Sequence, residues 1–170
     1  KINNNIKYED LTHYNVWKFF DLSEEEYYSM VHTFYESEEF EDMDLIKGVI
    51  EAISELSKNN EIIFITSRPE KIRIKTEKFL SKSFKNIDFT VFFAHDWGSK
   101  EEYKKSKGDY CVENNIPFFI EDHYDYALEC AKKGIKVFLL EQPWNKESEE
   151  HENIIKVKDW KEILEKINGY

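Results

Sequence analysis

Short apolar runs alternate with helical patterns from residue 44 to residue 170, and this alternation is the strongest limit on the fold. Strands are expected at residues 62–65, 89–94, 118–120 and 137–140, with amphipathic helices between them and a last helix near residues 160–167. Gly134 is placed to end one of these helices as a left-handed cap. Repeated alternation of strand and helix is typical of an α/β fold with a doubly wound parallel sheet, of the Rossmann-like kind.

The first 43 residues differ from the rest because they are dense in aromatic side chains and contain no strand-like run. Two or three short helices are expected there, and Ser23 followed by three glutamates is a good helix start. We therefore divide the chain into a small N-terminal helical cap, residues 1–43, and a Rossmann-like core, residues 44–170. Aromatic rings at this density usually form core, but the alternative is that some line a ligand pocket, namely Tyr14, Trp17, Phe19 and Phe20.

Length and charge narrow the class of protein further. A chain of 170 residues can bury roughly two thirds of its unfolded surface, so it needs no disulfide to be stable. The net charge of −11 argues against binding long nucleic acid, although a small anionic ligand stays compatible with it. No apolar run suits a membrane helix, and the first residues lack the shape of a signal peptide. Cys111 and Cys130 form no CxxC motif and are expected to be buried thiols, which favours a cytoplasmic protein.

Two adjacent acids, Glu121 and Asp122, follow the apolar run at residues 118–120. Ligands of parallel sheets bind beyond the carboxyl ends of the strands, so both acids would lie where chemistry is usually placed. Adjacent carboxylates repel each other, and magnesium, which prefers oxygen ligands, relieves that repulsion. A Mg²⁺ site at Glu121 and Asp122 is therefore one interpretation. The other is that Asp122 caps the helix that follows while Glu121 is solvated.

Other expected strands also end in polar groups, which are Thr66 and Ser67, His95 and Asp96, and Glu141 and Gln142. Lys107 begins the helix that leads into the strand at residues 118–120. A hydroxyl, a lysine and a carboxylate pair at one rim suit a phosphoryl group, because they offer donors for its oxygens and a metal for its charge. Alternatively, Lys107 belongs to a solvated helix face. The five histidines have no metal-ligand spacing and are expected to be solvated or packed.

Three short motifs lie in a fixed order along the core: IIFIT at residues 62–66, SKGD at residues 106–109 and IED at residues 120–122. They resemble the second, third and fourth motifs of the haloacid dehalogenase-like phosphohydrolases. TSRP at residues 66–69, GIKV at residues 134–137 and QPWN at residues 142–145 narrow the resemblance to the 5′(3′)-deoxyribonucleotidase branch and its uncharacterised microbial relatives. The resemblance extends over essentially the whole chain.

This resemblance implies a magnesium-dependent phosphatase of a nucleoside or deoxynucleoside monophosphate that works through a phosphoaspartate intermediate. Thr66 would bind the phosphoryl oxygens, and Lys107 would neutralise the nucleophile and the phosphate. Glu121 and Asp122 would hold Mg²⁺. Residues 1–43 would close over the nucleoside, and the secondary substrate contacts would be Ser67 and Arg68 together with the cap residues Tyr14, Trp17, Phe19 and Phe20.

The first motif of the family, an Asp-x-Asp at the end of an N-terminal strand, has no counterpart before the cap. Asp42 and Asp44 have the right spacing but follow no buried strand, and they are interpreted as helix caps. The 170 residues are therefore expected to be inactive alone, with about 15 to 30 upstream residues supplying a strand and the nucleophile. That strand should separate the strands that end at Thr66 and Glu121, which are expected not to pair directly.

Two further functions are left open by the sequence. One is a non-catalytic protein that binds a phosphate ligand or a partner on the same scaffold. The other is a phosphatase of sugar phosphates or nucleic acid ends. The expected partner is a small phosphorylated substrate, with no long nucleic acid and no membrane, and homodimerisation is left open.

Overall fold

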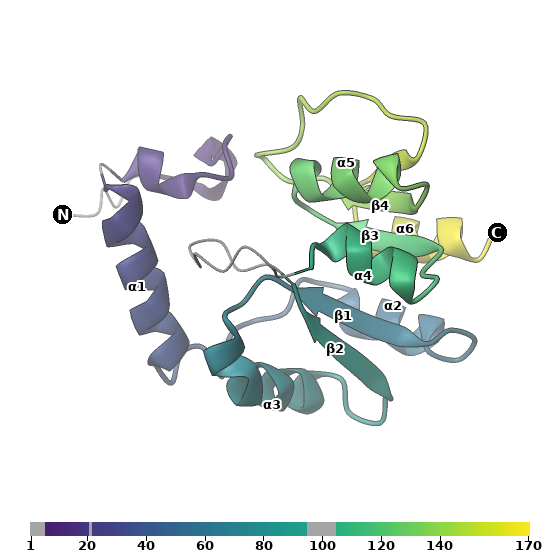
Figure 1. The fold of residues 1–170 in the computed structure, drawn as a ribbon, viewed down its shortest axis with the longest axis horizontal. Helices are drawn as coiled ribbons and strands as arrows, with labels where there is room; N and C mark the ends of the chain where they lie inside the picture. The colour runs from purple at the N-terminus through teal and green to yellow at the C-terminus, as the bar shows by residue number, and fades with distance from the viewer. Residues whose placement is uncertain (1–5, 21, 95–104) are drawn as a thin grey trace.

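The computed structural model describes residues 6–20, 22–94 and 105–170 (Figure 1). Its strands are β1 (Ile62–Thr66), β2 (Phe89–Phe93), β3 (Phe118–Glu121), β4 (Lys136–Leu140) and β5 (Ile154–Val157). Its helices, with 3-10 helices marked η, are η1 (Tyr8–Asp10), η2 (Val16–Phe19), α1 (Glu24–Glu36), α2 (Val49–Leu56), η3 (Glu70–Ile72), α3 (Arg73–Ser83), α4 (Lys107–Glu113), α5 (Tyr124–Lys132) and α6 (Trp160–Ile167). Strands and helices alternate along the core, and the predicted α/β fold class is confirmed.

The strands form two parallel ladders, one of β1 with β2 and one in which β4 lies between β3 and β5. Figure 1 shows the ladders next to each other, with α4 and α5 toward the viewer and α2 and α6 behind them. Within the described residues no ladder joins β1 to β3, as the sequence led us to expect. β5 was not expected from the sequence, and it extends the second ladder beyond β4.

The expected start of the first core helix is wrong. α2 begins at Val49 rather than near Asp44, because Gly48 has a left-handed backbone (φ 84°) that interrupts the helical pattern. The interpretation of Asp42 and Asp44 as helix caps is wrong for the same reason, and the Asp42 carboxylate instead binds Lys82 Nζ at 2.8 Å. Gly134 has the left-handed φ of 86° that was expected after α5. None of the helices described is long and apolar enough to span a membrane.

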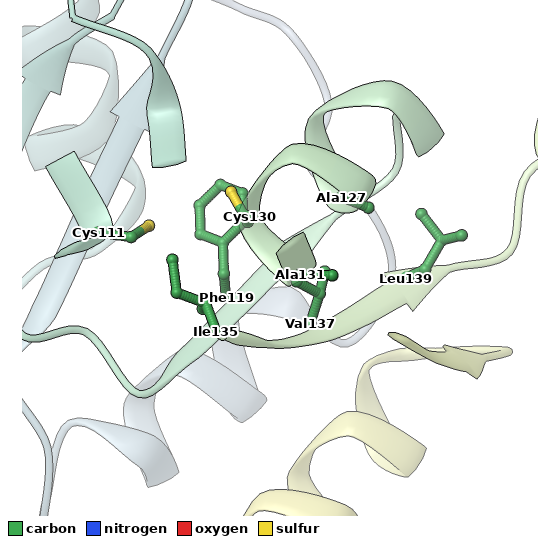
Figure 2. Packing of buried hydrophobic residues seen from close by; sticks show 8 residues of the cluster. All are labelled: Cys111, Phe119, Ala127, Cys130, Ala131, Ile135, Val137 and Leu139. Carbon is green, nitrogen blue, oxygen red and sulfur yellow. The ribbon is translucent and has the colours of Figure 1, made fainter. Parts of the chain in front are cut away.

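Buried apolar side chains of the described residues form three clusters, and Trp160 joins two of them. Figure 2 shows the first cluster, where side chains of α4, β3, α5 and β4 meet around the free, buried thiols of Cys111 and Cys130. The second cluster packs α2 and α3 against β1 and β2, and the third packs α6 against β3, β4 and β5. Trp160 packs against both, so the contact between α2 and α6 holds the two ladders together.

The N-terminal segment, residues 6–43, is tied to α3 at its far end. α1 begins with a capping box in which the Ser23 hydroxyl accepts from the Glu26 amide and the Glu26 carboxylate accepts from the Ser23 amide, as predicted. Lys75 Nζ of α3 donates to the backbone carbonyls of Tyr35 at 3.2 Å and Glu36 at 2.7 Å. The division of the chain into a cap and a core stays a prediction.

Candidate active site

A buried ion pair between Lys107 and Glu121 lies at the carboxyl end of β3. The Ser106 hydroxyl caps α4 by accepting from the Asp109 amide, which fixes Lys107 at the first position of the helix. Lys107 Nζ donates to Glu121 Oε2 at 2.6 Å, and the two side chains are 11% and 6% exposed. Burial raises the pKa of Glu121, but the nearby Lys107 charge and the hydrogen bonds to the carboxylate together outweigh burial and hold that pKa below its ordinary value. Lys107 is therefore part of a buried pair, and the solvated-face alternative is wrong.

The second oxygen of Glu121 is also engaged. Glu121 Oε1 accepts from the backbone amides of Asp122 at 3.0 Å and His123 at 3.1 Å. The N-cap residue of α5 is His123, and it makes no side-chain capping bond. The alternative that Asp122 caps this helix while Glu121 is solvated is therefore wrong, because Glu121 is buried and orients the turn after β3.

The adjacent carboxyl group of Asp122 is perturbed in the opposite direction from that of Glu121. Burial, and next the negative charge of Glu121, raise the pKa of Asp122 to about 7. Lys107 is the cation that opposes this shift, and it already pairs with Glu121. A divalent cation beside Asp122 would favour its ionised form, so the donor chemistry of this position fits magnesium. The described part of the chain holds no group of three His, Cys, Asp or Glu side chains arranged to bind a metal ion, so such an ion would rely on one or two carboxylates and water.

The residues after β1 reach the site in different ways. Thr66 Oγ1 accepts from the Arg68 amide at 3.2 Å, which closes the turn after the strand. The Ser67 hydroxyl donates to the Tyr126 hydroxyl at 3.4 Å, and the Tyr126 ring centre lies 4.3 Å from Lys107 Nζ. Ser67 is therefore linked to Lys107 through Tyr126.

Arg68 turns toward aromatic rings of another part of the molecule. Its guanidinium carbon lies 4.8 Å from the ring centre of Phe40 and 5.7 Å from that of Phe79. Burial lowers the pKa of Arg68. The structure thus brings Lys107, Glu121 and Asp122 together and directs Arg68 to the end of the N-terminal segment.

Tyr14 is the predicted cap residue that reaches the rim. Its ring centre lies 4.0 Å from that of His123, and its pKa is raised by burial and next by the charge of Asp122. Trp17 contacts Tyr27 of α1 (5.5 Å between ring centres). Phe19 stacks on His13 within the N-terminal segment, and Phe20 is half-buried. The assignment of Phe19 and Phe20 to the substrate stays a prediction.

Two curated relatives match nearly the whole chain. "Nucleotidase CA_C3379" of Clostridium acetobutylicum is 32% identical over 161 residues, which cover 93% of this chain and 77% of the relative. The chain belongs to this nucleotidase family. "Putative nucleotidase YqfW" of Bacillus subtilis is 26% identical over 168 residues, which cover 98% of this chain and 81% of the relative. No protein-family model matches the chain, and no solved structure does.

Sequence reasoning missed several residues that shape this nucleotidase-family site. Trp144 Nε1 and Asn145 Nδ2 donate to the backbone carbonyl of Asp122 at 3.0 and 2.8 Å, so the loop after β4 holds the turn that carries both acids. Tyr126 and His123 lie in and beside the first turn of α5, directly after β3. The available signal was their position two and five residues after Glu121. His95 and Asp96, which were expected at the end of β2, fall outside the described residues.

Proposed function

We propose that this protein is a magnesium-dependent phosphatase of nucleoside or deoxynucleoside monophosphates. The observation that carries the proposal is the buried Lys107–Glu121 pair beside Asp122, at the carboxyl ends of parallel strands. The relatives named as nucleotidases support a nucleotide as the substrate and a phosphate ester as the bond that is cleaved. The expected partner is accordingly a small phosphorylated molecule.

Each residue has a role in this proposal that follows from its chemistry. Lys107, held by Glu121, places a cation where negative charge develops on the phosphoryl group. Thr66 and Ser67 supply hydroxyl donors for the phosphoryl oxygens. Asp122 is the direct ligand of Mg²⁺, and bound Mg²⁺ would neutralise phosphate charge. Glu121 binds Lys107 with one oxygen and the turn after β3 with the other. It therefore positions Lys107 and Asp122 and is not the direct ligand of the metal.

The nucleophile in this proposal is an aspartate on a strand outside the 170 residues. Its carboxylate oxygen would form a bond to phosphorus while the bond from phosphorus to the nucleoside oxygen breaks, and a proton from an acid would go to that oxygen. Water would then release inorganic phosphate and restore the aspartate. A protein that binds phosphate without turnover is the alternative, because Lys107 and Asp122 could serve binding alone.

The test compares two lysines near the start of α4 in the phosphatase-active form of the protein. Lys107→Met is expected to lower kcat by at least about a hundredfold, because a cation aimed at developing charge in a dry site contributes several kcal/mol. Lys105→Met, which removes an exposed amine paired with Glu113, is the matched control and should keep near-normal turnover. Phosphate release from nucleoside monophosphates is measured well below the melting temperature of each variant. Near-normal kcat in Lys107→Met would refute the assignment.

A further inference from the structure

Tyr126, in the first turn of α5, lies against the amine of Lys107. Its ring centre is 4.3 Å from Lys107 Nζ, which is within the range of a cation–π contact. Lys107 Nζ also donates to Glu121 Oε2 at 2.6 Å, and the lysine side chain is 11% exposed. The ammonium is therefore mostly shielded from water. A ring face attracts a cation without forming a strong hydrogen bond, so Tyr126 leaves the other N–H groups of Lys107 for a phosphoryl oxygen.

The Tyr126 hydroxyl connects this contact to the turn after β1. The Ser67 hydroxyl donates to it at 3.4 Å. Ser67 follows β1 of one ladder and Tyr126 follows β3 of the other, so Tyr126 joins side chains that the two ladders bring to the site. Burial raises the pKa of Tyr126 to about 12. The hydroxyl is therefore uncharged at neutral pH, and its removal would take no charge from the site.

The same face of α5 fixes the backbone that carries Lys107. Glu129 follows Tyr126 by three residues, which places both on one side of the helix. The hydroxyl of Ser106, directly before Lys107, donates to the Glu129 carboxylate. A Cβ atom at Gly108 would lie 2.8 Å from Glu129 Oε1, so the glycine after Lys107 lets α4 approach α5 this closely. Because these contacts hold the start of α4 without Tyr126, replacing the tyrosine ring should free the lysine amine and leave the helix in place.

We propose that Tyr126 is a positioning residue for the cleavage of the phosphate ester, an inference that rests on the proposed function. Its ring holds the Lys107 amine toward the phosphoryl group, and its hydroxyl holds Ser67 at the same group. Lys107 meets charge that develops in the transition state, so its displacement lowers kcat. Ser67 donates to oxygens that the bound substrate already carries, so its release raises KM.

The first test removes the ring and the hydroxyl separately in the phosphatase-active form of the protein. Tyr126→Leu should lower kcat roughly 5- to 30-fold, because it removes a desolvated cation–π contact. Tyr126→Phe keeps the ring, so it should retain near-normal kcat while KM rises roughly 2- to 10-fold. The matched control is Tyr124→Leu, which makes the same change at a tyrosine of α5 that packs against the first cluster. This control should keep both constants near normal.

The second test observes Lys107 by NMR without turnover. Protons above the face of an aromatic ring resonate upfield, so the ε-methylene signal of Lys107 should lie upfield of that of Lys161, whose side chain is 83% exposed. The signal is assigned in protein with isotope-labelled lysine by its absence from Lys107→Met. The upfield shift should persist in Tyr126→Phe and be lost in Tyr126→Leu.

Equal losses of kcat in Tyr126→Phe and Tyr126→Leu would overturn the proposal, because a merely structural tyrosine would act in that way. Near-normal kcat in Tyr126→Leu, or an unshifted Lys107 signal in the unsubstituted protein, would overturn it too. Absence of phosphate release from the unsubstituted protein would refute the proposed function instead. The NMR comparison would then still decide whether Tyr126 holds the Lys107 amine.

Discussion

Replacing Glu121 with glutamine would remove one charge from the buried pair while keeping the size of the side chain. Lys107 would then be a cation that is 11% exposed and has lost its carboxylate at 2.6 Å. Breaking a buried pair by removing one partner costs about 3 to 5 kcal/mol, because the remaining charge is desolvated without compensation. We expect Glu121→Gln to lower the free energy of unfolding by this amount.

The assay is urea unfolding at neutral pH, followed by circular dichroism, with thermal unfolding as a second measurement. For a chain of this size the loss corresponds to a melting temperature lower by roughly 6 to 20 °C. The matched control is Glu113→Gln, which breaks the pair with Lys105 whose side chains are each 50% exposed. That exposed pair contributes about 0.2 to 1 kcal/mol.

The double variant Lys107→Met/Glu121→Gln completes a thermodynamic cycle. It should be more stable than the sum of the two single losses predicts, by about 1 to 3 kcal/mol, because no isolated charge remains buried. The reasoning would be refuted if Glu121→Gln cost no more than Glu113→Gln, or if the effects of the two single substitutions were additive.

Three more predictions concern the metal, the substrate and pH. Asp122→Asn should abolish the heat of Mg²⁺ binding in calorimetry while Glu113→Gln leaves it intact; equal heats in both variants would remove Asp122 from the metal site. Tyr14→Ala should raise KM for nucleoside monophosphates roughly 5- to 160-fold, because it removes a stacking contact worth about 1 to 3 kcal/mol. It should leave glycerol phosphate hydrolysis unchanged, and equal effects on both substrates would count against a base contact. The pKa of Asp109 is lowered to about 2 by a hydrogen bond from Lys133 and next by the Ser106 amide, so its stabilising contribution is present above the ordinary pKa of 3.8 and is lost as pH falls from there toward 2. Acid unfolding of Asp109→Asn should therefore be less steep over that interval than that of the unsubstituted protein, and identical profiles would contradict the assignment.

The strands that sequence patterns locate well are those whose residues are apolar in an unbroken run. β3 and β4 were placed to within a residue, because residues 118–120 and 137–140 are unbroken apolar runs, as is typical of strands that are covered on both faces. β5 was missed because Lys156 interrupts its apolar run. The Lys156 amine donates to the backbone carbonyls of Lys146 and Ser148. These contacts accommodate a lysine in the strand, and a local sequence pattern does not reveal them.

At the candidate site, the sequence predicted which residues lie near the strand ends but not the direction in which each side chain points. Lys107 was found from its place before β3, since a residue at the first turn of α4 must lie near a strand end. Arg68 was assigned to the substrate by its neighbours Thr66 and Ser67, yet its guanidinium packs against Phe40 and Phe79. Phe40 is far from Arg68 in sequence and Phe79 lies on α3, so the attraction of Arg68 to both rings is a tertiary effect.

The contact of the Arg68 guanidinium with the rings of Phe40 and Phe79 gives the N-terminal segment a physical link to the turn after β1. The ring of Phe40, which is fully buried, shields the guanidinium from water, and the Arg68 amide bonds to the Thr66 hydroxyl. Withdrawal of Phe40 would rehydrate the guanidinium and forfeit a cation–π contact worth about 0.5 to 2 kcal/mol. A movement of the N-terminal segment away from Arg68 would therefore also disturb Thr66, because the Arg68 amide donates to the Thr66 hydroxyl. The same arginine holds the position of that segment and closes the turn after β1.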